Sequence, residues 1–168
     1  MPDDSKRYFA AYLGGQGRHA SGLLALLKAF FHVPSQIEEF AGEWLAIPAE
    51  SQSCLGRPLG TQLGVDTVLG QYSWQRQYKF RIRLGPMNLA EYEGLLPGKP
   101  NLQLLGAIVR NYLGDELNWE VGLVLHKEQI PAARLGQYGQ LGLTSWFAPA
   151  IPVSDADDLA VGRTRLLV

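Results

Sequence analysis

Strict alternation of apolar and polar side chains predicts two strands in the middle of the chain. In residues 78–84 the apolar positions are Tyr78, Phe80, Ile82 and Leu84, separated by Lys79, Arg81 and Arg83. The same period of two recurs at Trp119, Val121, Leu123 and Leu125. Because successive side chains of a strand point to opposite faces, each segment is expected to bury one face. Shorter strands are expected around residues 37–40 and 44–47, on either side of Gly42.

Apolar residues at helical spacing predict four helices. The first is capped by Asp3, Asp4 or Ser5 and ends at Gly14, and the second is capped by Ser21 and ends before Pro34. The third begins after Asn88 and runs to Leu96, and the fourth spans about residues 102–113.

The second half of the chain resembles the first. The helical segment ALLKAFF (25–31) matches AIVRNYL (107–113) position by position, and LGVDTVL (63–69) has a counterpart in LGLTSWF (141–147). Bulky strand residues, Ile37 and Trp119, follow each helix at the same interval, and the sequence IPA recurs at 47–49 and 130–132, one residue out of step. Agreement of three ordered landmarks favours a duplication, although chance similarity between Leu-rich helices is the alternative. The predicted class is α+β, with two pseudo-symmetric helix-helix-strand-strand repeats packed as one module on a mixed or antiparallel sheet.

The repeat predicts how the chain is divided. Repeat one covers about residues 5–70, a linking strand about 71–86, and repeat two about 87–148, which together make a module over 1–148. Residues 149–168 are expected to form a solvated tail that includes Asp155, Asp157 and Asp158. Residues 48–62 and 131–140 are predicted as two equivalent projecting loops.

Composition narrows the class of protein. The 168 residues are 46% hydrophobic, enough for a real core, and the net charge of -1 gives no general attraction to nucleic acid or anionic membrane. The charged N-terminus and the short apolar runs predict neither a signal peptide nor a membrane-inserted helix. The single cysteine, Cys54, fits a reducing compartment, so a cytoplasmic protein is expected.

Candidate chemistry is sparse. The glycines of residues 17–22 lack the lysine and the preceding strand of a phosphate-binding loop. The three histidines, His19, His32 and His126, lack the close spacing of a metal site, and Cys54 has no nucleophile signature around it. No catalytic residue, metal, cofactor or small-molecule substrate is predicted. An enzyme that uses Cys54 with a histidine is the remote alternative.

Charged and aromatic residues are the candidates for an interface with nucleic acid or with another protein. The basic residues of strand 78–84 resemble a nucleic-acid-binding strand, but they lie on the face opposite the rings, so they are expected to meet water or an acidic protein surface. Trp44, Trp119 and Trp146 are predicted to be core residues. The same holds for Trp74 by residue type, but because it lies between the polar residues Ser73 and Gln75 an exposed anchor for a partner is the alternative.

A family resemblance rests on landmarks in order along the chain. They are SGLLALLKAFFHVP (21–34), LGVDTVLG (63–70), FRIRLGP (80–86), LLPG (95–98) and LGLTSW (141–146). With these motifs the chain resembles the TssG (ImpH, VasB) family of the type VI secretion system, over nearly all residues to about Phe147. The family's N-terminal half is expected to be missing ahead of the first helix.

The resemblance implies a structural subunit of the type VI secretion baseplate, part of a contractile injection system. Its implied partners are TssF, TssK trimers and the sheath-initiating subunit TssE, at a baseplate docked to the inner-membrane complex. The two projecting loops are the candidates for TssK contacts, through Leu55, Arg57 and Leu59 in one and Leu135 and Tyr138 in the other. A cytoplasmic interaction adaptor unrelated to secretion is the closest alternative.

Overall fold

A four-stranded mixed sheet forms the centre of the protein. The computed structural model describes residues 7, 9, 10, 14, 17–54, 62, 64, 65, 67–132, 139–146 and 154–162. The sheet order is β1-β4-β5-β6, with bounds Ser35–Glu38, Lys79–Met87, Asn118–Leu125 and Ala156–Gly162. The central pair β4 and β5 is parallel, and both outer pairs are antiparallel. The predicted α+β class with a mixed sheet is therefore confirmed.

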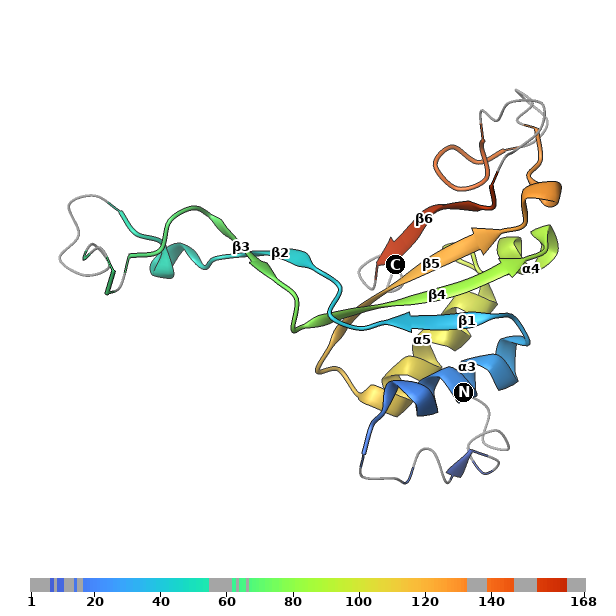
Figure 1. The fold of residues 1–168 in the computed structure, drawn as a ribbon, viewed down its shortest axis with the longest axis horizontal. Helices are drawn as coiled ribbons and strands as arrows, with labels where there is room; N and C mark the ends of the chain where they lie inside the picture. The colour runs from blue at the N-terminus through green and yellow to red at the C-terminus, as the bar shows by residue number, and fades with distance from the viewer. Residues whose placement is uncertain are drawn as a thin grey trace.

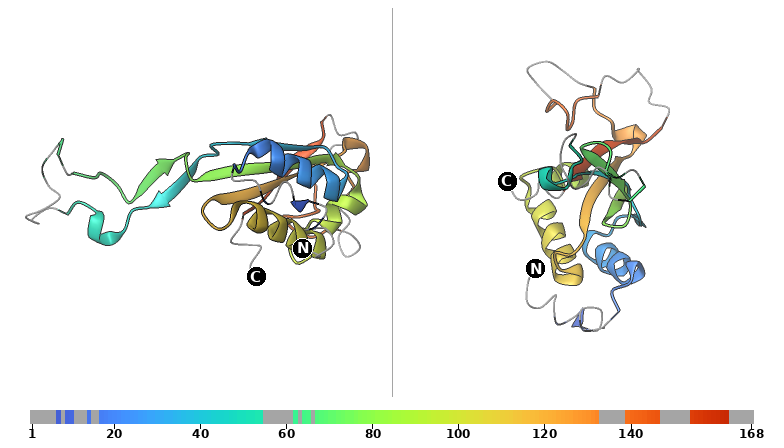
Figure 2. Two further views of the ribbon diagram at one scale, coloured as in Figure 1. Left: turned by 90° about the horizontal axis from the view of Figure 1, so that it is seen from below. Right: turned by 90° about the vertical axis from the view of Figure 1, so that its left-hand side faces the viewer.

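Helices cover one face of this sheet. They are α3 (Ala20–Phe31), α4 (Leu89–Gly94) and α5 (Pro100–Leu113), and Figures 1 and 2 show them on the same side of the strands. The apolar positions of the two alternating strands point toward them, since Phe80, Ile82 and Leu123 are buried in one cluster with Leu27 and Leu105. We call this sheet with its helices the body. Burial of that one face explains the period of two in β4. In β5 every residue from 119 to 125 is buried, so the expectation of a single buried face is wrong for that strand.

Local signals located the helices well, with one error at a cap. Asn88 caps α4 as predicted, in a capping box with Glu91 that satisfies a backbone N–H at each residue. The predicted cap Ser21 is wrong, because α3 begins at Ala20 and its N-cap is His19, which makes no side-chain capping bond. The first predicted helix, before Gly14, falls largely outside the described residues.

A second, two-stranded sheet lies beside the body. It pairs β2 (Glu43–Ala46) with β3 (Tyr72–Gln75) in antiparallel register. Figure 1 shows this ribbon reaching away from the helices, and short 3-10 turns follow at η1 (Ala49–Ser51) and, in the body, at η2 (Lys127–Gln129). The predicted linking strand over 71–86 is therefore two strands in different sheets. We call β2, β3 and the described residues between them the arm.

The C-terminal stretch corrects another expectation. Residues 156–162 form strand β6, which pairs with β5 and buries Leu159 and Val161. Its three aspartates have partners: Asp155 accepts a hydrogen bond from the Lys127 N–H, Asp157 pairs with Arg83, and Asp158 accepts from the Trp146 ring. A solvated tail is thus wrong for this segment, because β5 has an open edge that the tail completes.

Two further predictions concern duplication and membranes. A helix followed by a strand occurs in both halves, as α3 with β1 and as α5 with β5, while the repeat itself stays a prediction. None of the helices in the described ranges combines the length and the apolar character that a bilayer crossing requires.

Candidate protein-interaction site

Aromatic side chains gather on one face of the arm. Trp44 in β2 lies directly opposite Trp74 in β3, and Ala46 lies opposite Tyr72. Because the pairs are two residues apart on each strand, all four side chains share a face. That face is open: the exposed fractions are 66% for Trp44, 51% for Trp74 and 58% for Tyr72. An apolar surface of this kind on a ribbon without a covering layer is typical of a protein-binding site.

The two tryptophans contact each other at an angle. Their ring centroids are 5.3 Å apart and the ring planes meet at 61°, an edge-to-face arrangement. A Cβ atom on Gly42 would lie 1.9 Å from Cζ2 of Trp74, so the ring occupies the space that a side chain at this position would need. Of the two alternatives for Trp74, the structure has the exposed ring, and its role as an anchor stays a prediction. The predicted burial of Trp44 is wrong, because none of the helices in the described part of the chain packs on β2 and the ring is 66% exposed.

Sequence reasoning missed Tyr72 as a member of this face. The available signal was the one that identified Trp74, a large ring between polar neighbours, here Gln71 and Ser73. Beyond the ribbon, Val65 and Leu69 are also exposed, at 78% and 82%, which extends the apolar character along the arm. The five loop residues predicted to bind TssK, namely Leu55, Arg57, Leu59, Leu135 and Tyr138, lie outside the described residues.

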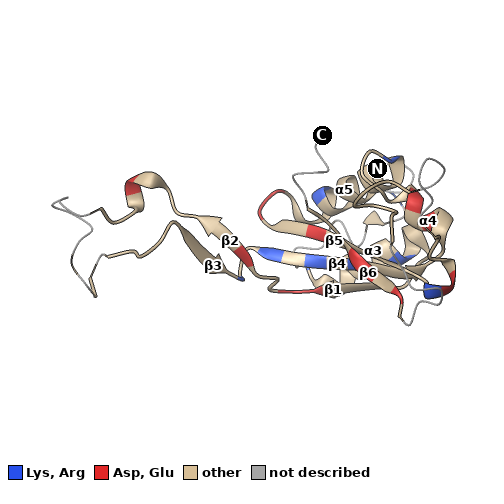
Figure 3. Cartoon of the chain, turned by 90° about the horizontal axis from the view of Figure 1, so that it is seen from above, with Lys and Arg blue, Asp and Glu red and all other residues tan. Residues whose placement is uncertain are grey.

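The other candidate surface, the basic row of β4, is neutralised within the protein. Lys79 Nζ lies 2.7 Å from Glu120 Oε2 and Arg81 Nε lies 2.6 Å from Glu120 Oε1. Arg81 also reaches Glu38 in β1 at 3.2 Å, and Arg83 pairs with Asp157 in β6. Figure 3 shows these basic positions on β4 flanked by acidic positions of the neighbouring strands. The charges thus meet acidic residues of the same sheet, which removes the case for nucleic acid.

Glu120 is the centre of this charged row. Its burial favours the neutral carboxyl, but hydrogen bonds from Lys79 and Arg81 outweigh that effect and lower its pKa below the ordinary value. The reciprocal hydrogen bond raises the pKa of Arg81. Both groups therefore stay charged near neutral pH, and the row links all four strands of the open sheet face.

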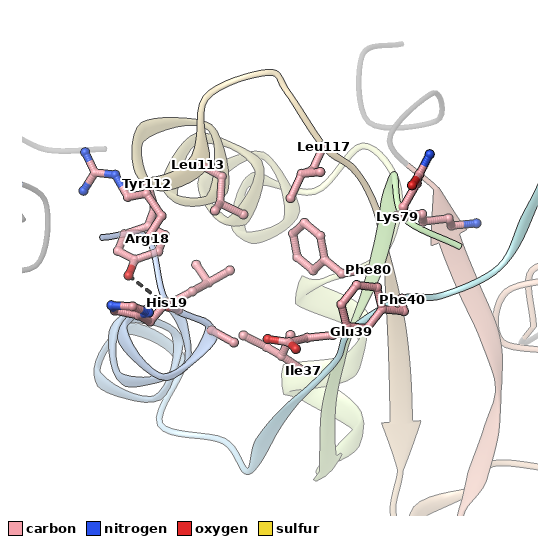
Figure 4. Close-up of a pocket in the computed structure, with 13 residues that line it drawn as sticks. Arg18, His19, Ile37, Glu39, Phe40, Lys79, Phe80, Tyr112, Leu113 and Leu117 are labelled. Atoms are coloured by element: carbon pink, nitrogen blue, oxygen red, sulfur yellow. Dashed lines mark hydrogen bonds between the residues drawn. The ribbon is translucent and has the colours of Figure 1, made fainter. Parts of the chain in front are cut away.

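An apolar pocket of about 220 Å³ lies where the arm joins the body. Figure 4 shows rings and aliphatic chains from α3, α5 and the strands around it, among them Ile37, Phe40, Phe80 and Leu117. Tyr112 closes one side, donating a hydrogen bond from its hydroxyl to the His19 carbonyl at 3.0 Å. Charged side chains, among them Arg18, Glu39 and Lys79, also line it, so the pocket is a surface depression of mixed character in which apolar groups predominate.

The residues considered for catalysis are not brought together. Cys54 is exposed on the arm, whereas His19 and His32 flank α3 and His126 follows β5 in the body. Among the residues that the structure describes, no group of three or more His, Cys, Asp or Glu side chains could hold a metal ion.

Comparison with known families decides what kind of protein this is. The sequence model of one family, described as type VI secretion, TssG, matches residues 1–148. The chain belongs to the TssG family. The matched range agrees with the resemblance to about Phe147, and β6 lies beyond it. A comparison with curated proteins gave no significant match.

Two solved structures share the fold of this TssG family member. One is a chain of the type VI secretion system TssK-TssF-TssG baseplate subcomplex, solved by cryo-electron microscopy, with a TM-score of 0.68 and 20% identity. The match covers 96% of the present chain and 72% of that chain. The other belongs to the baseplate complex of the type VI secretion system, with a TM-score of 0.57, 23% identity, and coverage of 96% and 49%.

Proposed function

We propose that this TssG family protein is a structural subunit of the type VI secretion baseplate that binds other subunits and catalyses no reaction. The observation that carries the proposal is the exposed Trp44, Tyr72 and Trp74 face on an arm that reaches away from the body. Tryptophan and tyrosine are the side chains that most often dominate binding at protein interfaces, because they bury a large area with few rotatable bonds.

The partners proposed are TssF, TssK and TssE. TssF and TssK accompany TssG in the subcomplex whose chain shares this fold, and TssE follows from the family resemblance alone. The setting proposed is the bacterial cytoplasm, at a baseplate docked to the inner-membrane complex. The arm is assigned to TssK, since the sequence of loop 48–62 follows β2 and precedes β3, the two strands that carry the aromatic face. Loop 131–140 is the second proposed contact.

The two-repeat architecture belongs to the same proposal. The alignment that matches residues 25–31 with 107–113 also places the last residue of α3, Phe31, on the last residue of α5, Leu113. The strands that follow, β1 and β5, lie on either side of β4, one antiparallel and one parallel to it, as a pseudo-twofold axis through β4 requires. The arm and β6 have no counterparts among the described residues, so they distinguish the halves.

The test is capture of purified TssK and TssF by this protein. Replacing Trp44 and Trp74 together by Ala is expected to weaken TssK capture at least about 30-fold, the cost of losing an aromatic hot spot. Ser73→Ala, on the opposite face of β3, is the matched control. A second variant, with Leu55, Arg57 and Leu59 each replaced by Ala, tests loop 48–62. A third variant, with Leu135 and Tyr138 each replaced by Ala, tests loop 131–140.

The outcomes separate the candidate functions. Capture of TssF with loss of TssK in the tryptophan variant supports the assignment of the arm. Unchanged TssK capture by all three variants refutes it. Binding of neither TssF nor TssK by the unaltered protein contradicts the baseplate role and leaves the unrelated interaction adaptor.

A further inference from the structure

The joint between arm and body has an unusual backbone. Two segments cross it, residues 39–42 between β1 and β2 and residues 76–78 between β3 and β4. Phe40 has a φ of 58°, in the left-handed region that bulky side chains rarely adopt. Arg76 in the other segment holds it, with Nε donating a hydrogen bond to the Phe40 carbonyl at 3.1 Å. The two crossing segments are thus fastened to each other.

A single arm residue, Glu43, has polar contacts with two strands of the body. Its Oε1 accepts a hydrogen bond from Asn118 Nδ2 at 2.9 Å, at the start of β5. Its Oε2 lies 3.9 Å from Lys79 Nζ, at the start of β4. These side chains are largely withdrawn from water, with 19% of Glu43 and 16% of Lys79 exposed. A contact that joins residues 75 positions apart, in two different sheets, constrains their relative direction.

The contact is continuous with the charged row of the body. Lys79 also binds Glu120, which in turn binds Arg81, and Arg81 reaches Glu38. Each of these side chains is held by a neighbour of opposite charge. If the arm changes direction, Lys79 therefore cannot move with Glu43 without losing its contact to Glu120. A two-stranded ribbon is only marginally stable without further packing, so its direction depends on contacts such as these at its root.

We infer that Glu43 is the positioning residue of the arm: its bonds to Asn118 and Lys79 hold the ribbon in one direction relative to the body. The consequence for binding rests on the proposed function. An arm that is held in one direction before binding loses less conformational entropy when its aromatic face binds a partner. The affinity of the protein for that partner is therefore higher. Without the Glu43 contacts the arm samples a range of directions, and only a fraction of the molecules has the direction that the partner binds. The apparent affinity falls by that fraction.

Distances between spin labels on arm and body measure this directly. The native Cys54 on the arm is exposed and takes one label, and Gln103→Cys on the exposed face of α5 takes the other. A narrow distance distribution is expected for the protein with Glu43 intact. Glu43→Ala is expected to broaden it at least about twofold, and Glu43→Gln, which keeps an acceptor for Asn118, is expected to lie between.

Glu39→Ala is the matched control, since it removes the same charge from an exposed glutamate in the joint. The inference holds if Glu43→Ala broadens the distribution and Glu39→Ala leaves it narrow. A narrow distribution in Glu43→Ala, or equal broadening in both variants, overturns it. Far-ultraviolet circular dichroism of each variant verifies that the body is folded.

Capture of TssK distinguishes this inference from the proposed function. Glu43→Ala is expected to weaken capture about tenfold while the aromatic face is intact, the effect of one lost charge-assisted hydrogen bond. If the labelled arm loses its direction but the unaltered protein captures no TssK, the proposed function fails and the role of Glu43 stands.

Discussion

The body and the arm use the same kinds of side chain for opposite purposes. In the body, Phe80 and Trp119 are 6% and 7% exposed beneath the helices, whereas in the arm Trp44 and Trp74 are 66% and 51% exposed. The difference is the covering layer: α3, α4 and α5 pack on the four-stranded sheet, and none of these described helices lies on the two-stranded ribbon (Figure 2). Aromatic residues therefore stabilise the core of the body, whereas on the arm they form an exposed face that we propose binds a partner.

The largest expected effect is on the stability of the body. Leu123→Ala removes a side chain with 0% exposure from the middle of β5 and leaves a cavity between the sheet and the helices. The free energy of unfolding is expected to fall by about 2 to 5 kcal/mol. Urea unfolding followed by circular dichroism measures it.

Trp44→Ala is the comparison for that variant. Its side chain is mostly in water, so the free energy of unfolding is expected to change by less than about 1 kcal/mol. A loss in Trp44→Ala as large as that in Leu123→Ala would mean that the arm contributes to the same core, and the division into body and arm would be wrong.

The next effect is local to the arm. In Gly42→Ala the new methyl group would overlap the Trp74 ring, which must turn away and separate from Trp44. The loss of the ring pair is worth about 1 kcal/mol, so TssK capture is expected to weaken by about tenfold or less. Near-ultraviolet circular dichroism reports the change in the tryptophan environment.

A glycine with open space around it provides the control for this substitution. No atom lies within 4 Å of a Cβ built on Gly162 in β6, so Gly162→Ala is expected to leave the tryptophan signal unchanged. An unchanged signal in Gly42→Ala as well would contradict the close contact between Trp74 and the β2 strand.

The smallest effect concerns the charged row of the body. The folded-state pKa of Glu120 lies below its ordinary value, so its ionised form stabilises the protein above the unfolded pKa of about 4.3. That contribution is lost as the pH falls through the lowered pKa. Glu120→Gln is expected to reduce the free energy of unfolding at pH 7 by about 1 kcal/mol or less, and the deficit is expected to shrink at pH 3.

The matched control is Glu116→Gln, an exposed glutamate in the turn before β5. It is expected to have no measurable effect at either pH. A deficit in Glu120→Gln that is constant from pH 7 to pH 3 would show that packing, and not the ion pairs to Lys79 and Arg81, accounts for its role.

Much of the body could be predicted from local patterns. The alternation in residues 78–84 and 119–125 located β4 and β5, and Asn88 marked the start of α4. These signals are reliable because burial of one sheet face and satisfaction of helix ends act within a few residues. The family landmarks, spread over most of the chain, identified the TssG family that the sequence model also matches.

Of the aromatic face, only Trp74 was considered as an exposed residue from the sequence. Trp44 was assigned to the core, Tyr72 was missed, and the five predicted loop residues lie outside the described residues. Ser21 failed as a cap because α3 already begins at Ala20, after the extended N-cap residue His19, so Ser21 lies inside the first turn. Trp44 was assigned to the core because a large apolar side chain prefers burial. The residue type does not show whether another element of the fold covers it.

By itself the sequence determined most helices and the two long central strands of the body, the apolar face of β4, and which family the chain belongs to. Only the tertiary structure decided that β3 leaves the central sheet to form the arm, that residues 156–162 complete the sheet edge, and that Glu43 joins the two regions. Pairing of strands depends on contacts between residues far apart in the chain, and periodicity carries no information about the partner.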